Sequence, residues 1–238
     1  MKRNSEAEPA QAVVFTRAGV LLGMRRFAPL ALSVFAYGMV FGVLARQAGL
    51  SLGAAAGMSA FVSAGSSQLV AIGMWQTPLP VVSIVFTTLV VNLRHVLMGA
   101  ALRPYLGSIS KARLFPMLHL MGDESWAMAM QEFEQGRRDL GFMLGCGLLG
   151  LTAWVGSTMA GHLAASAIPD PAEFGLDFAF TAVFLALLVG MWKGRSSLLP
   201  VAGAVVLSLL ASQVLGGKWY IVVGGLAGSL LGAWQDAD

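Results

Sequence analysis

Long apolar runs without a single charged residue dominate this sequence. Asp, Glu, Lys and Arg do not occur from Gln47 to Leu93, from Gly141 to Pro169 or from Ser196 to Gly217. The hydrocarbon core of a bilayer is about 30 Å thick, and about 20 residues of α-helix cross it. Each run is long enough to cross, and the first is long enough to cross twice or to turn back. The pattern therefore predicts an all-α integral membrane protein.

The apolar stretches predict a bundle of about six to eight transmembrane segments. One of them, Ser51–Trp75, is interrupted at its centre by Ser63–Gln68, so we expect a broken or re-entrant helix there. We divide the chain into a basic N-terminal segment (1–26), a single transmembrane domain (27–235) and a C-terminal tail (236–238). The expected spans lie near residues 27–45, 79–102, 140–165, 177–192, 196–214 and 218–235.

Composition supports the membrane interpretation. Hydrophobic residues make up 57% of the chain and charged residues 11%, whereas a soluble domain carries roughly 25% charged residues. A soluble protein with so few charges would lack the polar groups to cover its surface. The single cysteine, Cys146, excludes an intrachain disulfide or a cysteine metal site, and we interpret it as a packing residue.

Basic residues in short loops predict the orientation. The basic residues before Phe27 place the N-terminus in the cytoplasm, and Arg103, Lys111 and Arg113 mark a second cytoplasmic stretch. Both assignments hold if Ser51–Trp75 returns to its own side of the membrane. The alternative is a full crossing with a compensating span at 114–130. We favour re-entry, in a multi-pass protein of the bacterial cytoplasmic (inner) membrane.

Glycines recur at intervals of four residues, which places them on one face of a helix and lets neighbouring backbones approach closely. We expect most of these faces to pack within the bundle, and one of them to be available to a second subunit. The pairs and triplets are Gly38/Gly42, Gly53/Gly57, Gly141/Gly145 and Gly224/Gly228/Gly232.

The first polar cluster inside an apolar run is the sequence Ala64-Gly65-Ser66-Ser67-Gln68. A helix that starts near Ser66 at membrane depth would point unpaired N–H groups and its positive dipole end at an anionic group such as an α-carboxylate. Gln68 would add a donor and an acceptor. The alternative is a kink in which the serine hydroxyls bond to their own backbone.

The second cluster is Asn92-Leu93-Arg94-His95, preceded by Thr88, which shares a helix face with Asn92 and His95. Asn92 would bind substrate or bridge to the break. His95 has a side chain suited to proton coupling, although a lone histidine is more often structural. Arg94 is interpreted as a residue that reaches the headgroups. We interpret His119 and His162 as packing or interface residues.

The third cluster is Asp123-Glu124, within the mostly apolar stretch Leu114–Met130. If that stretch spans the membrane, the two carboxyls are candidates for an ammonium contact or for proton coupling. If it is an interfacial helix, Asp123 is its N-cap.

The sequence lacks the motifs of the common hydrolases and nucleotide-binding enzymes, so we expect no enzyme activity, no cofactor and no bound metal. The basic N-terminus is explained by membrane orientation and gives no reason to expect nucleic-acid binding.

At these residues the chain resembles the azaleucine-resistance (AzlC) family of branched-chain amino-acid permeases. The resemblance extends from about Phe27 to Trp234. The matching pieces are Pro29 with Tyr37–Gly42, Ala48–Ser51, Met58-Ser59, Ala64–Gln68, Val91–His95, Asp123-Glu124 and Gly175–Ala179.

The resemblance implies the large subunit of an exporter of valine, leucine and isoleucine, driven by the proton-motive force. It also implies a small, separately encoded AzlD-type membrane subunit as partner. The residues themselves predict substrate binding by Gly65, Ser66, Ser67, Gln68 and Asn92, and proton coupling by His95, Asp123 and Glu124. Two alternatives stay open: a channel or facilitator for another small solute, and a scaffold subunit of a membrane complex.

Overall fold

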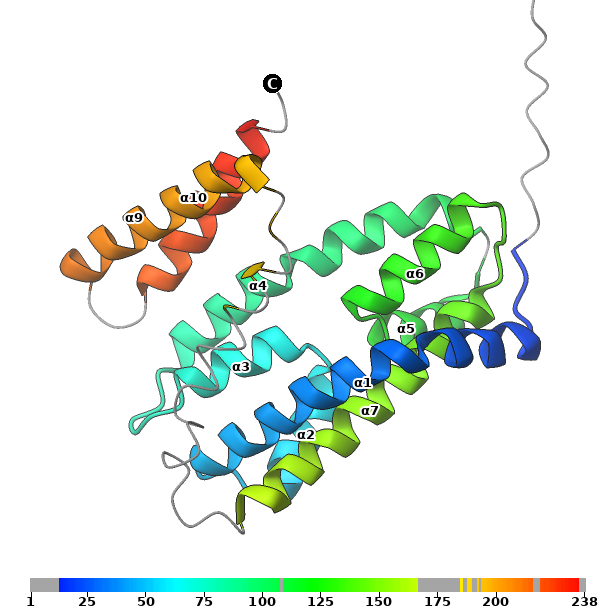
Figure 1. The fold of residues 1–238 in the computed structure, drawn as a ribbon, viewed down its shortest axis with the longest axis horizontal. Helices are drawn as coiled ribbons and strands as arrows, with labels where there is room; N and C mark the ends of the chain where they lie inside the picture. The colour runs from blue at the N-terminus through cyan, green and yellow to red at the C-terminus, as the bar shows by residue number, and fades with distance from the viewer. Residues whose placement is uncertain are drawn as a thin grey trace, which may run out of the picture. The chain divides into compact units, whose positions relative to one another are not determined.

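A computed structural model describes residues 13–107, 109–166, 194–215 and 219–235, with the single residues Leu185, Leu188, Val189 and Trp192. In this part of the chain the architecture is all-α, apart from one isolated bridge between Val14 and Asp139. The α-helices are α1 (Arg17–Gln47), α2 (Leu52–Val62), α3 (Gly65–Gly73), α4 (Val81–Leu102), α5 (Lys111–His119), α6 (Asp123–Glu134), α7 (Leu140–Ser166), α9 (Leu198–Val214) and α10 (Trp219–Gln235) (Figure 1).

Four helical stretches among the described residues are long and apolar enough to cross a membrane. They are Arg17–Gln47, Val81–Tyr105, Leu140–Ala165 and Gly194–Val214. The expected spans at 79–102, 140–165, 196–214 and 218–235 agree with α4, α7, α9 and α10 to within two residues. The expected span at 177–192 lies almost entirely outside the described residues.

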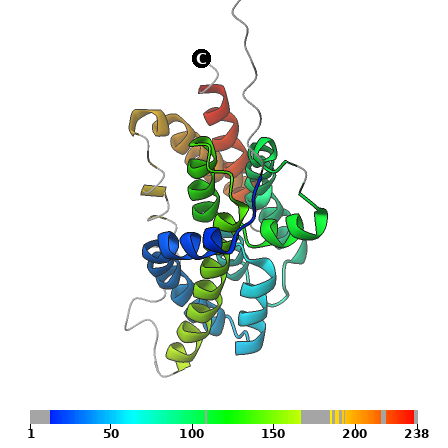
Figure 2. The ribbon, with the colours of Figure 1, turned by 90° about the vertical axis from the view of Figure 1, so that its right-hand side faces the viewer.

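Helix α1 begins at Arg17, ten residues before the start that we expected at Phe27. The reason is a buried stripe at a spacing of four residues, formed by Gly19, Gly23 and Phe27. A Cβ atom added at Gly23 would come within 2.1 Å of the Phe142 carbonyl oxygen, so α1 and α7 are in backbone contact here. Figure 2 shows this first part of α1 passing across α7. Packing on α7 therefore extends the helix beyond its apolar run.

The stretch Leu114–Met130 is not a continuous span, which corrects one of the two interpretations left open above. It is divided between α5 and α6, which are separated at Leu120–Gly122. The N-cap of α6 is Gly122 rather than Asp123, and its backbone N–H donates to Ser125 Oγ at 2.9 Å. Asp123 and Glu124 are exposed in the first turn of the helix, where carboxylates interact favourably with the helix dipole.

Two compact units make up the chain. The first contains Met1–Gly38 and Arg94–Ser157, and the second contains Met39–Leu93 and Thr158–Asp238. Helices α2 and α3 belong entirely to the second unit, which the chain enters along α1 and leaves along α4. In the same unit, α9 and α10 lie side by side as a helical hairpin (Figure 1).

Candidate functional site

The break predicted in Ser51–Trp75 is present, and it separates two short helices. Helix α2 ends at Val62, Ser63 has a left-handed backbone (φ 48°), and α3 begins at Gly65. At about 1.5 Å per residue, neither an 11-residue nor a 9-residue helix crosses a core of about 30 Å. Figure 1 shows the two helices following different directions on either side of the break.

The two helices begin differently. Helix α2 is capped in the usual way, because Ser51 Oγ accepts a hydrogen bond from the Ala54 N–H at 3.2 Å. Helix α3 follows Ala64, which offers no side-chain cap. The N-cap residue of α3 therefore contributes no side-chain oxygen to the first turn of the helix.

A buried chain of hydrogen bonds joins the break to its neighbours in the second unit. Ser67 Oγ donates to Asn92 Oδ1 at 2.6 Å, which ties α3 to α4. Gln68 Nε2 donates to Ser59 Oγ of α2 at 3.2 Å, and that hydroxyl lies 2.8 Å from Thr158 Oγ1 of α7. Ser59, Ser67, Gln68 and Thr158 are each at most 1% exposed. We call these four residues and Asn92 the polar network.

Two further polar side chains of the second unit are buried without full hydrogen bonding. Thr87 Oγ1 on α4 has no partner among the described residues. The neighbouring Thr88, which we had placed on the functional face, instead bonds to its own backbone at Ile84 O, 2.7 Å away. His162 on α7 contacts Leu50 O through Nε2 at 2.8 Å, while its Nδ1 has no partner in the described structure.

The residues predicted to couple protons belong to the first unit. Asp123 forms an ion pair with Arg94, with 2.8 Å between Oδ2 and Nη1. Arg94 therefore has a protein carboxylate beside it, whereas we had interpreted it as reaching for headgroups. His95 is half-buried on α4.

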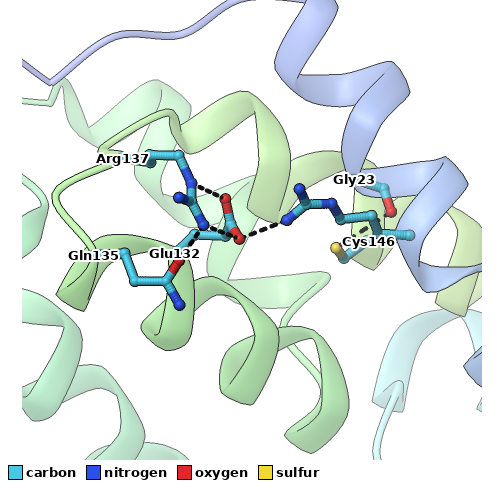
Figure 3. A network of polar contacts seen from close by, with 6 residues as sticks. Gly23, Glu132, Gln135, Arg137 and Cys146 are labelled. Atoms are coloured by element: carbon cyan, nitrogen blue, oxygen red, sulfur yellow. Dashed lines mark hydrogen bonds and ion pairs between the residues drawn. The ribbon is translucent and has the colours of Figure 1, made fainter.

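A second charged cluster, which we did not predict, is centred on Glu132 of α6. Its carboxylate accepts hydrogen bonds from Arg26 Nη1 at 2.6 Å and from Arg137 at 2.6 and 2.8 Å. Figure 3 shows Arg137 and Gln135 beside Glu132, and Cys146 beside Gly23. The hydrogen bonds from Arg137 lower the pKa of Glu132, desolvation opposes them, and the charge of Arg26 adds to the lowering. Contact with Glu132 also raises the pKa of Arg137. The cluster fastens α6 to α1.

The family model described as "AzlC protein" matches residues 29–168 of this chain, more than half of its length. This chain belongs to the AzlC family. The match includes all of α2, α3, α4 and α7, and with them every member of the polar network. The AzlC resemblance proposed from the sequence is thereby confirmed, and the chain is an all-α membrane protein of that family.

Two curated relatives of this AzlC chain are informative. An "Uncharacterized membrane protein" from Archaeoglobus fulgidus is 33% identical over 214 residues, which cover 87% of this chain and 91% of the relative. The "Branched-chain amino acid transport protein AzlC" of Bacillus subtilis is 28% identical over 143 residues, which cover 60% of this chain and 56% of the relative. No solved structure matches this chain.

Sequence reasoning found part of the polar network in this AzlC chain and missed the rest. It singled out Ser67, Gln68 and Asn92, but it did not select Ser59 or Thr158. Thr158 and His162 are four residues apart inside the charge-free run 141–169, so they share a helix face. That spacing was the one available signal for the contribution of α7.

Proposed function

We propose that this AzlC-family chain is the large subunit of a secondary transporter that exports valine, leucine and isoleucine, driven by the proton-motive force. The family and the name of the Bacillus relative support transport as the general activity. The direction of transport, the three substrates and the energy source go beyond what that name says. We base them on the family resemblance and on the candidate site.

The observation that carries the proposal is the uncapped start of α3 at the centre of a buried polar network. A helix start without a side-chain cap offers N–H groups and a partial positive charge, which suit an α-carboxylate. Gly65 and Ser66 form the first turn, and Ser67, Gln68 and Asn92 supply hydroxyl and amide groups next to it. We assign these five residues to substrate binding.

The surroundings of the network suit an aliphatic side chain. Leu69, Val70 and Ile72 of α3 and Phe41 of α1 are buried in the same unit, and none of them carries a polar side-chain atom. A branched aliphatic group gains about 25 cal/mol per Å² when it leaves water for such surroundings. The network selects an amino acid by its main-chain groups, and the apolar residues select it by its side chain.

The path of the chain supports re-entry of Ser51–Trp75. Helices α2 and α3 both lie in the unit that α1 enters and α4 leaves, as expected if the segment returns to the side from which it came. The exposed Arg17, Arg25 and Arg26 near the start of α1 support a cytoplasmic N-terminus. His95, Asp123 and Glu124 remain our sequence-based candidates for proton coupling.

An AzlD-type small membrane subunit is the proposed partner. Most of the glycines spaced by four lie against other atoms of the same chain. A Cβ at Gly42, for example, would come within 2.1 Å of Thr158 O, whereas a Cβ at Gly53 or Gly57 would meet no described atom within 4 Å. This open glycine face on α2 is suited to close packing with a helix of a second subunit.

The test is efflux of preloaded radiolabelled valine, leucine and isoleucine from cells that express the chain, alone and with an AzlD-type protein from the same genome. We expect efflux that requires both chains, collapses with an uncoupler, and falls at least tenfold in Asn92→Ala at equal expression. Efflux that persists without any gradient would favour a channel. Normal efflux in Asn92→Ala and Gln68→Ala would favour a scaffold, and no efflux of any of the three would refute the substrate assignment.

A further inference from the structure

His162 is a buried imidazole, and one of its two ring nitrogens makes no hydrogen bond within the described structure. The residue is 2% exposed on α7, one helical turn after Thr158 of the polar network. Its Nε2 lies 2.8 Å from the carbonyl oxygen of Leu50, which can only accept, so Nε2 carries the hydrogen in the neutral ring. Nδ1 is then an acceptor, and it has no partner among the described residues.

The second unit offers few other groups that could take up a proton. In its described residues the titratable side chains are Arg46, His162, Arg195 and Tyr220. Arginine has no free lone pair and tyrosine has no basic nitrogen, so His162 is the one of these four that offers a basic nitrogen lone pair.

The described elements that contact α7 around His162 carry no carboxylate. They are the last part of α1, where Gly42 is in backbone contact with α7, and the segment that runs from Leu50 into α2. Arg46 is the charged side chain on these elements, and it is exposed. A protonated His162 would thus have no carboxylate from α1, α2 or the described part of α7 to stabilise it.

From this geometry we propose that Nδ1 of His162 binds the ammonium group of the exported amino acid and, in alternation, the transported proton. The inference rests on the proposed function and deepens it. Neutral Nδ1 has one lone pair, which accepts a hydrogen bond from the substrate ammonium or binds a proton, but never both. The start of α3 holds the carboxylate of the substrate in either case.

Mutual exclusion at one lone pair produces exchange of substrate for proton. On the cytoplasmic side the ammonium displaces the proton from Nδ1, and the proton is released into the cytoplasm. On the outer side a proton binds Nδ1 and the amino acid leaves, so one proton enters for each zwitterion exported. The buried position of His162 makes the alternation strict, because a cationic imidazole and an ammonium group cannot occupy the same desolvated place.

The experiment uses everted membrane vesicles that contain the chain and its AzlD-type subunit, so that the cytoplasmic face meets the medium. Leucine exchange without a gradient is measured from pH 5.5 to 8.5, and accumulation driven by an imposed proton gradient is measured separately. In the wild type the apparent KM for exchange should rise as the pH falls, by up to about tenfold per pH unit, because one proton competes with one substrate.

The decisive variant is His162→Gln, since the Gln amide can still donate to Leu50 O and offer an acceptor but does not titrate. We expect a KM for exchange that is independent of pH, and at least a tenfold loss of gradient-driven accumulation. His119→Gln, the same change at an exposed position, is the matched control. Asp123→Asn and Glu124→Gln test the sequence-based candidates in parallel.

Several results would overturn the inference. One is gradient-driven accumulation that survives in His162→Gln. Another is a KM for exchange that still rises with falling pH in His162→Gln as it does in the wild type. A wild-type KM that does not change with pH would by itself overturn the inference. Absence of leucine, valine and isoleucine transport in the wild type would instead refute the proposed function itself.

Discussion

Replacing Glu132 with Gln should destabilise the first unit measurably. The carboxylate is 8% exposed and accepts three short hydrogen bonds from two guanidinium groups. A hydrogen bond to a charged group contributes roughly 1.5–3 kcal/mol. The arginine side chains are 47% and 54% exposed, so water replaces much of what they lose. We therefore expect a loss of about 2–3 kcal/mol rather than the sum of three bonds.

The labelling rate of the native Cys146 measures this loss of stability, so no cysteine has to be introduced. It is the one cysteine of the chain, it is 0% exposed, and it belongs to the same unit as Glu132, packed with Phe27 and Phe142. A thiol-reactive dye reaches it when the unit opens. At about 1.4 kcal/mol per tenfold, the expected loss raises the labelling rate about 30- to 140-fold in detergent.

The control is Glu134→Gln, the same substitution on the same helix at an exposed position. It should leave the labelling rate within about twofold, as expected for a surface change. A change of less than threefold in Glu132→Gln would show that the cluster does not hold α6 on α1. The result would then refute the assignment of the cluster as the fastening between these helices.

The pH dependence follows from the lowered pKa of Glu132. A carboxyl whose pKa is lower in the folded than in the unfolded state stabilises the fold above its ordinary value of 4.5. That stabilisation is lost as the pH falls through the lower pKa of the folded protein. The midpoint of thermal unfolding should therefore fall in this acidic range in the wild type, and Glu132→Gln should lack this component.

Three further predictions concern the helix contacts and the buried hydroxyl. Gly161→Ala places a Cβ atom 2.1 Å from Met39 O and should lower thermal stability by about 1–3 kcal/mol, whereas Gly156→Ala, with nothing within 4 Å, should not. Thr87→Val removes a buried hydroxyl without a described partner, so it should raise stability by about 1 kcal/mol. If that hydroxyl binds substrate, transport falls in the same variant. Gly57→Leu should abolish co-purification with the AzlD-type subunit, and Gly156→Leu should preserve it.

The sequence predicted those features that depend on local composition. The break before Gly65 follows from serine and glycine in an apolar run, and α4, α7, α9 and α10 follow from hydropathy. A bridge from Asn92 to the break was one of the two roles considered for Asn92, and the hydrogen bond from Ser67 to Asn92 is such a bridge, because polar groups at membrane depth need partners.

The remainder depends on tertiary packing that hydropathy does not encode. The first ten residues of α1 are helical because Gly19 and Gly23 lie against α7, and a glycine stripe has no hydropathy signal. Ser59 and Thr158 are isolated hydroxyls in apolar helices, and their importance appears only when α2 and α7 are seen to meet. His162 resembles any structural histidine until Nδ1 is seen to be buried and unpaired.

The central claim is that the start of α3 and the polar network bind an amino acid by its carboxylate. The most direct measurement is equilibrium binding of radiolabelled leucine to the purified complex, with leucine amide, whose carboxylate is blocked, as competitor. We predict saturable leucine binding that valine and isoleucine displace, leucine amide displaces at least 30-fold less well, and Asn92→Ala and Gln68→Ala each weaken at least tenfold. Binding that both variants retain in full, or equal competition by leucine amide, would contradict the account.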